Sequence, residues 1–423
     1  VWAAADAAAT NYVISGLGFT PKLIVARALG ISNASDGTST TANQQESAGV
    51  CVSTSSRRSV GASDVDAAAA SDCGTIVRDD CIICQVSGAG ANAGRLDISA
   101  IGADGFTFTV DTQGAQNLSV FWEAFGGDDI SVAVCGDVTE PAATGNAAVT
   151  ATGMTAGGTD QCAWFFGSQS TAALNTGAAN DAGFCAGFAT DASSQVMIAN
   201  NADDGSATID TDKIQISGEC LGMIPVAGGA AMDARGSFVS WDTDGFTINW
   251  LSRNVTGRRY IFAAVKGGQW KAGALTINVQ TAANTASVGS LPFQPKGVSV
   301  MGLSGAENAA NTTASHSVAI FGQASGTAAR QAMALRHENG VANVNITQAV
   351  EYDQIWVQVD SAGTVNLRLD LDAINSDGFR LIVDTADATG STVYWIGYLT
   401  FGDAPAGNTI PVLMNQYRQR MAA

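Results

Sequence analysis

The sequence has few charged residues, 14% of 423, and only two histidines. Its 20 basic residues are outnumbered by 38 acidic ones and never cluster beyond a pair, as in Arg57-Arg58 and Arg258-Arg259. A chain with a net charge of −18 is repelled by phosphate backbones, so we expect no nucleic-acid binding.

Long apolar runs are also missing. None approaches the roughly 18 residues that a membrane-spanning helix needs, so we expect no membrane partner. The first residues, beginning Val1-Trp2-Ala3, carry neither a basic region nor a continuous apolar one, so we expect no signal peptide among them.

No long amphipathic helical pattern occurs, although apolar residues make up 46% of the chain. Gly, Ala, Ser and Thr are abundant, and short apolar runs are separated by turn-forming residues. This combination is typical of an ordered, β-rich protein with many turns.

One pattern occurs three times, as Asp104-Gly105-Phe106, Asp244-Gly245-Phe246 and Asp377-Gly378-Phe379. In each copy an Asp-Gly turn precedes a segment in which every second residue is large and apolar, which predicts a strand with one buried face. Another aromatic residue follows each Phe by sixteen positions, across a polar connector, so we expect each unit to end in a β-hairpin. The expected core residues of these hairpins are Phe106, Trp122, Phe246, Phe262, Phe379 and Trp395.

The copies are 140 and then 133 residues apart, which is the size of one domain. We therefore predict an all-β protein of three tandem antiparallel β-sandwich, jelly-roll-like repeats. The predicted boundaries are unit 1 at 1–127, a linker strand plus unit 2 at 128–268, a linker strand plus unit 3 at 269–402, and a C-terminal tail at 403–423. The basic end of this tail either contacts a neighbouring protein or is a frayed terminus.

All eight cysteines lie in the first two units. An even number permits disulfides, and we expect Cys51 to pair with Cys81 or Cys84, and Cys185 with Cys220, once the protein has left a reducing cytosol. A zinc or redox role for Cys81 and Cys84 is disfavoured because no second Cys-x-x-Cys follows. The candidate disulfide cysteines are Cys51, Cys73, Cys81, Cys84, Cys135, Cys162, Cys185 and Cys220.

Motifs for catalysis are scarce. A hydrolytic triad needs a histidine beside a nucleophile, and His337 lies in a turn-like Glu-Asn-Gly context. Asp242-Thr243-Asp244-Gly245 resembles the start of a calcium loop but lacks the downstream Glu, so a turn explains it better. We therefore expect no enzyme activity, no cofactor and no metal.

A longer pattern in the first unit runs from Gly18-Phe19-Thr20-Pro21-Lys22 through Ser55-Ser56-Arg57-Arg58 and Asp104-Gly105-Phe106-Thr107 to an aromatic strand and Gly126-Gly127. This pattern resembles a repeat found in uncharacterised structural proteins of tailed bacteriophages and prophages. The second unit lacks the Pro-Lys pair and the third lacks the Arg pair. The resemblance implies a virion component and supplies no catalytic residues.

We expect a non-enzymatic virion structural protein, in a capsid decoration, neck or tail, that binds other virion proteins and copies of itself. Such a protein is made in the host cytoplasm and is extracellular after lysis. Two alternatives remain open: a carbohydrate-binding or receptor-binding module of a tail appendage, with a glycan as partner, and a subunit of an extracellular filament.

Overall fold

The computed structural model describes residues 1–31, 35–225, 232, 234–253, 257–308, 316–388 and 390–403, and the backbone of 412–414. All regular structure in these residues is β-strand, and every strand pair is antiparallel. The expected all-β antiparallel sandwich class is therefore confirmed. No helix capable of crossing a membrane occurs in the described part of the chain.

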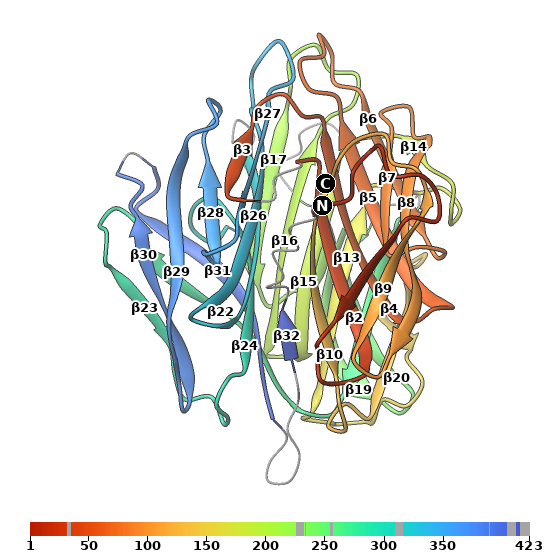
Figure 1. Cartoon of the computed structure of the whole chain (residues 1–423), viewed down its shortest axis with the longest axis vertical. Helices are drawn as coiled ribbons and strands as arrows, with labels where there is room; N and C mark the ends of the chain where they lie inside the picture. The colour runs from red at the N-terminus through yellow and green to blue at the C-terminus, as the bar shows by residue number, and fades with distance from the viewer. Residues whose placement is uncertain are drawn as a thin grey trace.

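Three four-stranded sheets of identical strand order form the outside of the molecule (Figure 1). Burial alternates along their strands, because one face packs inward and the other meets solvent. In sheet order these outer sheets are β1 (Asn11–Ser15), β9 (Gly105–Thr112), β8 (Asn92–Gly102) and β7 (Ile83–Val86); β12 (Gly145–Thr150), β20 (Gly245–Ser252), β19 (Ala234–Asp242) and β18 (Leu221–Met223); and β23 (Thr285–Val288), β30 (Gly378–Thr385), β29 (Val365–Asn375) and β28 (Trp356–Val359).

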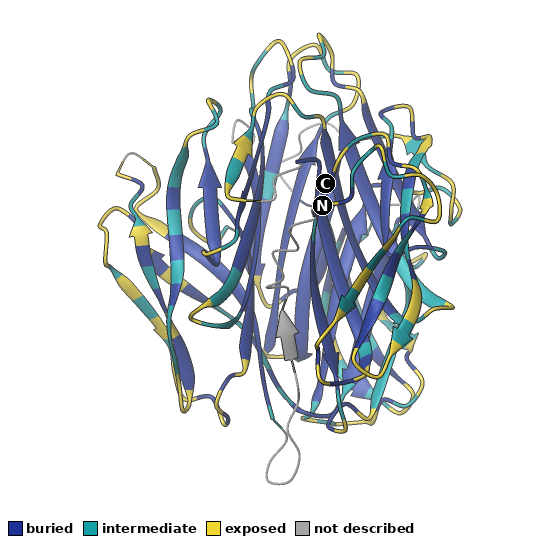
Figure 2. Ribbon diagram, in the orientation of Figure 1, coloured by how far each residue is buried: buried dark blue, intermediate teal, exposed yellow. Residues whose placement is uncertain are grey.

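Each outer sheet covers one larger inner sheet, whose strands are buried on both faces (Figure 2). The inner sheets are β6 (Cys73–Arg78), β5 (Ser56–Asp64), β4 (Gln44–Ser53), β2 (Pro21–Leu29) and β10 (Ser119–Gly126) in unit 1; β11 (Val132–Thr139), β21 (Arg259–Lys266), β13 (Gln161–Ser168), β15 (Phe184–Asp191), β16 (Ser194–Ala202) and β17 (Thr211–Ser217) in unit 2; and β22 (Gln269–Asn278), β31 (Val393–Gly402), β24 (Gly297–Leu303), β25 (Ser317–Gly326), β26 (Ala329–His337) and β27 (Ile346–Glu351) in unit 3.

This layering gives four large apolar cores among the described residues, beside two clusters of four residues each. Each unit has a sandwich core between its outer and inner sheets. A fourth cluster, which we call the central core, takes residues from all three inner sheets, among them Val25 of unit 1, Trp164 of unit 2 and Met301 of unit 3. The three units are therefore packed around one shared interior rather than strung out along a line.

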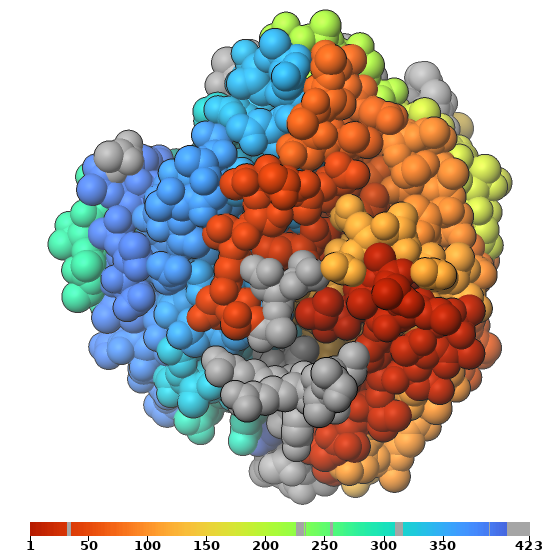
Figure 3. Space-filling model, turned by 45° about the horizontal axis from the view of Figure 1, so that its top comes forward, coloured from red at the N-terminus to blue at the C-terminus, as the bar shows by residue number. Residues whose placement is uncertain are grey.

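Each unit also lends a short segment to a neighbour. β3 (Gly37–Ser39), from unit 1, pairs with β27 of unit 3, and red N-terminal residues lie against blue unit 3 residues in Figure 3. β14 (Ala178–Ala179), from unit 2, pairs with β6 of unit 1. Asn308 of unit 3 bridges to Gln215 in β17 of unit 2. The exchange runs around all three units and interlocks them.

The two linker strands and the C-terminal strand occupy the opposite sheet edges. β11 and β22, which fall in the expected linkers, pair with the last inner strand of the unit that follows them. β32 (Val412–Met414) pairs with β10, the last inner strand of unit 1. The other residues expected in the tail, Asp403 apart, lie outside the described part of the chain.

The prediction that each unit ends in a β-hairpin is wrong. β9 belongs to an outer sheet and β10 to an inner one, so the connector between them crosses the sandwich. The Asp-Gly turn instead closes the hairpin between β8 and β9, where Gly102 pairs with Gly105. Alternating apolar residues indicate a buried face but not which strand lies alongside, so the sequence could not distinguish the two arrangements.

Candidate functional site

The repeated aspartates of the Asp-Gly turns hold backbone amides. The Asp104 carboxylate accepts hydrogen bonds from the amides of Gly16 and Gly18, at 3.0 and 2.6 Å, and these bonds lower its pKa. Asp244 accepts one from Gly153 at 2.7 Å, and Asp377 one from Ser290 at 3.3 Å. Each aspartate therefore fixes the loop after the first outer strand of its unit.

The aromatic partner of the third unit is not the expected residue. Phe106 packs edge-on against Trp122 and Phe246 against Phe262, both with ring centroids 5.1 Å apart. Phe379 packs in the same manner on Tyr398, at 5.3 Å. Trp395 is buried in the central core and its indole nitrogen lies 3.3 Å from Ser217 Oγ. The shift arises because three extra residues precede Tyr398 in unit 3.

The cysteines form no bridge; all eight are free thiols. The Cys51 thiol donates a hydrogen bond to Ser53 O at 3.2 Å, and Cys81 Sγ lies 3.3 Å from Ser59 Oγ. Both sulfurs therefore have a hydrogen-bond partner that is not a cysteine. Cys185 and Cys220 lie in one sandwich core without being bonded. Burial raises the pKa of Cys51 and of Cys185 to about 12, which keeps both thiols protonated and unreactive.

Three glycines give a common reference for comparing units. Gly49, Gly187 and Gly322 each face a backbone oxygen of the segment entering the outer sheet, so no side chain fits there. Counted from these glycines, Cys51 matches Ala189, and Cys185 matches Ser47. The two cysteines therefore do not occupy equivalent places, although both follow a Gly by two residues.

The most unusual polar group lies in the middle of the central core. Arg27 and Glu123, both in unit 1, are buried and their charged atoms approach to 3.8 Å. The guanidinium lies between the rings of Phe166 of unit 2 and Phe321 of unit 3, 5.4 and 5.1 Å from their centroids. Ser299 of unit 3 donates a hydrogen bond to Glu123. One ion pair thus contacts all three units.

Burial works against both charges of this pair. It lowers the pKa of Arg27, while the carboxylate of Glu123 raises it again; burial raises the pKa of Glu123, while Arg27 lowers it. The matching positions in unit 3 are Met301 and Leu399, which are apolar. The pair is therefore a feature of unit 1 alone and is not part of the repeat.

A second buried cluster joins units 1 and 3. His337 Nε2 lies 3.8 Å from Asp64 Oδ2. Cys73 is opposite Asp64 in the pairing of β5 with β6, and its thiol donates to the backbone oxygens of Ala202 and Asp203, both at 3.7 Å. Burial raises the pKa of Asp64 to about 7 and lowers that of His337 to about 4. These are the residue types of a thiol hydrolase, but no hydrogen bond joins His337 to the thiol and all three side chains are closed off from solvent.

The arginine pairs meet across the boundary of units 1 and 2. Asp137 on β11 lies 3.4 Å from Arg58 Nε and 3.2 Å from Arg259 Nη1. Arg57 forms its own ion pair with Asp97, at 2.7 Å. The adjacent basic residues of both pairs are therefore engaged by acidic ones within the molecule.

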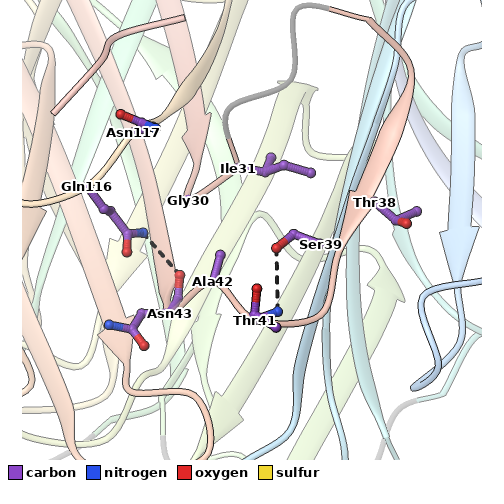
Figure 4. Close-up of a pocket in the computed structure, with 9 residues that line it drawn as sticks. All are labelled: Gly30, Ile31, Thr38, Ser39, Thr41, Ala42, Asn43, Gln116 and Asn117. Carbon is purple, nitrogen blue, oxygen red and sulfur yellow. Dashed lines mark hydrogen bonds between the residues drawn. The ribbon is translucent and has the colours of Figure 1, made fainter. Parts of the chain in front are cut away.

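One open pocket, of about 370 Å³, lies where unit 1 meets unit 3 (Figure 4). Gln116 Nε2 donates to Asn43 O at 3.0 Å, and the amide of Thr41 to Ser39 Oγ at 3.5 Å. The lining is neutral and mostly polar, without an aromatic ring or a charge: Gly30, Ile31, Thr38, Ser39, Thr41, Ala42, Asn43, Gln116 and Asn117. Amides and hydroxyls of this kind suit a neutral, hydroxyl-rich ligand better than an ion.

Acidic oxygens of Asp36, Glu351 and Asp353 lie within 4.8 Å of one another. Glu351 accepts a hydrogen bond from Arg368 at 2.8 Å, and Asp36 accepts the amide of Tyr352 at 2.8 Å. Two of the three carboxylates therefore have partners in the protein, and the cluster is explained by the packing of β3 against β27.

Sequence reasoning missed Arg27, Glu123 and Asp64. One signal was present, since Arg27 stands alone in the apolar run from Leu23 to Leu29. A lone charge in such a run is either exposed or paired inside the protein, and only the tertiary structure distinguishes these possibilities.

Comparison with known protein families and with curated proteins finds no match. Among solved structures, fructofuranosidase from Schwanniomyces occidentalis complexed with fructose is 7% identical over 93% of this chain and 97% of that chain, with a TM-score of 0.14. A score this low carries no argument about fold or activity.

Proposed function

We propose that this chain is a non-enzymatic structural protein of a bacteriophage virion, in a capsid decoration, neck or tail, that binds other virion proteins. The observation that carries the proposal is the central core, which packs three sandwiches of one strand order into a single block. Such a block has the outline of a trimer and fits places of local three-fold symmetry in a shell or tail.

The outside of the block supports the same proposal. The strands β1, β12 and β23 take equivalent places in the three outer sheets, and the outer sides of β12 and β23 have no strand partner among the described residues. A row of free backbone amides and carbonyls can pair with an extended segment of another protein. Similar edges on one chain therefore provide similar attachment places, which suits a symmetric particle.

Purified phage particles test this proposal. Quantitative mass spectrometry of particles should find the chain in many copies each, and particles assembled without its gene should recover it when the purified protein is added. Particles that contain no copy, and that do not bind the purified protein, would refute the assignment.

A carbohydrate-binding role is the second candidate, and the neutral polar pocket favours it. The test is a glycan array read with the wild-type protein and with a Gln116→Leu variant, because Gln116 lines the pocket and contacts Asn43 O. A sugar that binds the wild type at least tenfold more tightly than the variant supports this role. Equal binding by both proteins, or none, contradicts it.

A further inference from the structure

The sulfurs of Cys81 and Cys84 lie against the same short stretch of β5 in unit 1. Cys81 Sγ is 3.3 Å from Ser59 Oγ. Cys84 Sγ is 3.7 Å from Ser47 Oγ, and a Cβ added to Gly61 would meet this sulfur at 2.9 Å. Ser59 and Gly61 are two positions apart on β5, so they share one face of the strand and are about 6–7 Å apart. The two cysteines therefore occupy adjacent places, and both belong to one small apolar cluster.

Cys51, the expected partner of these cysteines, is directed elsewhere. Its thiol donates to Ser53 O, and among the cysteines it is Cys135 that adds to the effect of burial in raising its pKa. Burial raises the pKa of Cys81, and Cys84 raises it further. The positions of the sulfurs therefore favour a pairing of Cys81 with Cys84. The lack of a second Cys-x-x-Cys argues against a four-sulfur metal site, but a disulfide needs only these two sulfurs.

The thiol pair is a feature of unit 1 alone. The three glycines that face a backbone oxygen make Ile82, Cys220 and Ile355 equivalent. The residues that take the places of Cys81 and Cys84 are Glu219 and Gly222 in unit 2, and Gln354 and Val357 in unit 3. The fold does not require sulfur at either place, so packing alone does not account for a cysteine at both.

We propose that Cys81 and Cys84 are an oxidation site, at which a low-molecular-weight disulfide such as oxidised glutathione converts the two thiols into an intramolecular disulfide. The Cys84 thiolate attacks one sulfur of the small disulfide, forms a mixed disulfide and releases a first small thiolate. Cys81 then attacks Cys84 Sγ, which forms the bond between the two cysteines and releases a second small thiolate. The two protein thiol protons go to the released thiolates, and two electrons pass from the protein to the small disulfide.

The first attack is assigned to Cys84 because its surroundings favour the thiolate. Burial alone would raise the pKa of Cys84, but the Cys81 thiol, two serine hydroxyls and the charge of Arg78 lower it below its usual value. Cys81, whose pKa is raised, keeps its proton until the mixed disulfide has formed. The thiolate rather than the thiol is the nucleophile in disulfide exchange.

The turn between β6 and β7 controls access to the pair. Both cysteines are buried, whereas Asp79 and Asp80, which come directly before them, are half-buried. Asp80 holds this turn in place through ion pairs with Arg78 and Arg95, both at 2.7 Å. Oxidation therefore takes place while the chain folds or when the turn opens, and the finished bridge is shielded from reducing agents. This inference does not depend on the virion assignment.

Peptide mapping after oxidative folding tests the pair. The chain is unfolded in urea and refolded in a mixture of reduced and oxidised glutathione, and the free thiols of the soluble product are alkylated. Trypsin cuts after Arg78 and Arg95, so both cysteines fall in one peptide, 79–95. We expect the bridged form of this peptide, lighter by two hydrogens and not alkylated, to exceed the alkylated form by about tenfold, because a buried bridge resists reduction by glutathione.

Cys185 and Cys220 provide the matched control, since both are buried in one sandwich core. Cys220 lies in the tryptic peptide 214–235, and we expect this peptide to be alkylated. In Cys81→Ser and Cys84→Ser, the cysteine that remains in peptide 79–95 should also be alkylated. Equal bridging of the test pair and the control pair would show unselective oxidation and contradict the proposal.

Alkylation of both cysteines in peptide 79–95 of the soluble wild-type protein would refute the proposal, as would a bridge from either of them to a different cysteine. If the chain does not refold from urea, the same mapping is done on protein purified from cells with an oxidising cytosol and from cells with a reducing one. A bridged peptide 79–95 from the oxidising cells alone supports the proposal, and an alkylated peptide from both refutes it.

Discussion

The central core and the three sandwich cores differ in how closely the three units repeat one another. In the sandwich cores the units repeat one another: Phe106, Phe246 and Phe379 each pack edge-on against an aromatic ring of the last inner strand of their unit. In the central core they diverge, because Arg27 of unit 1 stands where unit 2 has Phe166 and unit 3 has Met301. A sandwich core can be built from one repeated sequence, whereas a shared interior needs three surfaces that fit one another.

The largest effect is expected from breaking the central ion pair. Glu123→Leu leaves Arg27 buried without its carboxylate and should lower the free energy of unfolding by about 3–5 kcal/mol. Urea denaturation measures the loss. The double variant Arg27→Met and Glu123→Leu carries the residues of unit 3 and should recover to within about 1 kcal/mol of the wild type. If the single variant is as stable as the double, the pair has no such role.

A pH effect should come from Glu46, which faces the central core. Burial raises its pKa from 4.5 to about 8, although a hydrogen bond from Gln44 opposes the shift. The folded state therefore holds a proton that the unfolded state loses, so the stability that this group provides is complete below pH 4.5 and falls as the pH rises to 8.

Glu46→Gln removes this titration. The variant should match the wild type near pH 4.5 and exceed it at pH 8 by at most about 4 kcal/mol. Asp64 shifts stability in the same direction and His337 in the opposite one, so only the difference between variant and wild type isolates Glu46. Parallel stability curves for the two proteins across this range would contradict the assignment.

The sandwich cores, in which the three units repeat one another, are tested at Gly322. A Cβ there collides with the backbone oxygen of Ile355, so Gly322→Ala should cost about 1–3 kcal/mol. Gly49→Ala and Gly187→Ala should cost a similar amount, since the same collision occurs in each unit. Gly326→Ala, at the end of the same strand as Gly322 and with open space around it, is the control and should change stability by less than about 0.5 kcal/mol. Thermal unfolding of all four variants gives the comparison.

The smallest loss of stability is expected at the boundary of units 1 and 2. Asp137→Asn removes the acceptor shared by Arg58 and Arg259 and should cost about 1 kcal/mol at low salt, less at high salt. Asp372→Asn, which breaks a more exposed pair with Arg380 inside unit 3, should cost less. Equal losses for the two variants at every salt concentration would mean that Asp137 does not link the units.

The outer sheets were the predictable part of this protein. Alternating residues after each Asp-Gly turn indicated β9, β20 and β30, because one buried face leaves a period of two in the sequence. The inner strands leave no such period. β4 reads Gln-Gln-Glu-Ser-Ala-Gly-Val-Cys-Val-Ser and is nevertheless buried over most of its length, since small and polar residues fit between two closely packed layers.

The sequence by itself determined the β class and the recurrence of one turn, because turn chemistry and alternation are local properties of the chain. Only the tertiary structure decided that the units share an interior, that Tyr398 rather than Trp395 is the partner of Phe379, and that a strand from the end of the chain closes unit 1. These features depend on contacts between residues up to about 290 positions apart, such as Phe125 and Val412, and no local pattern encodes such pairings.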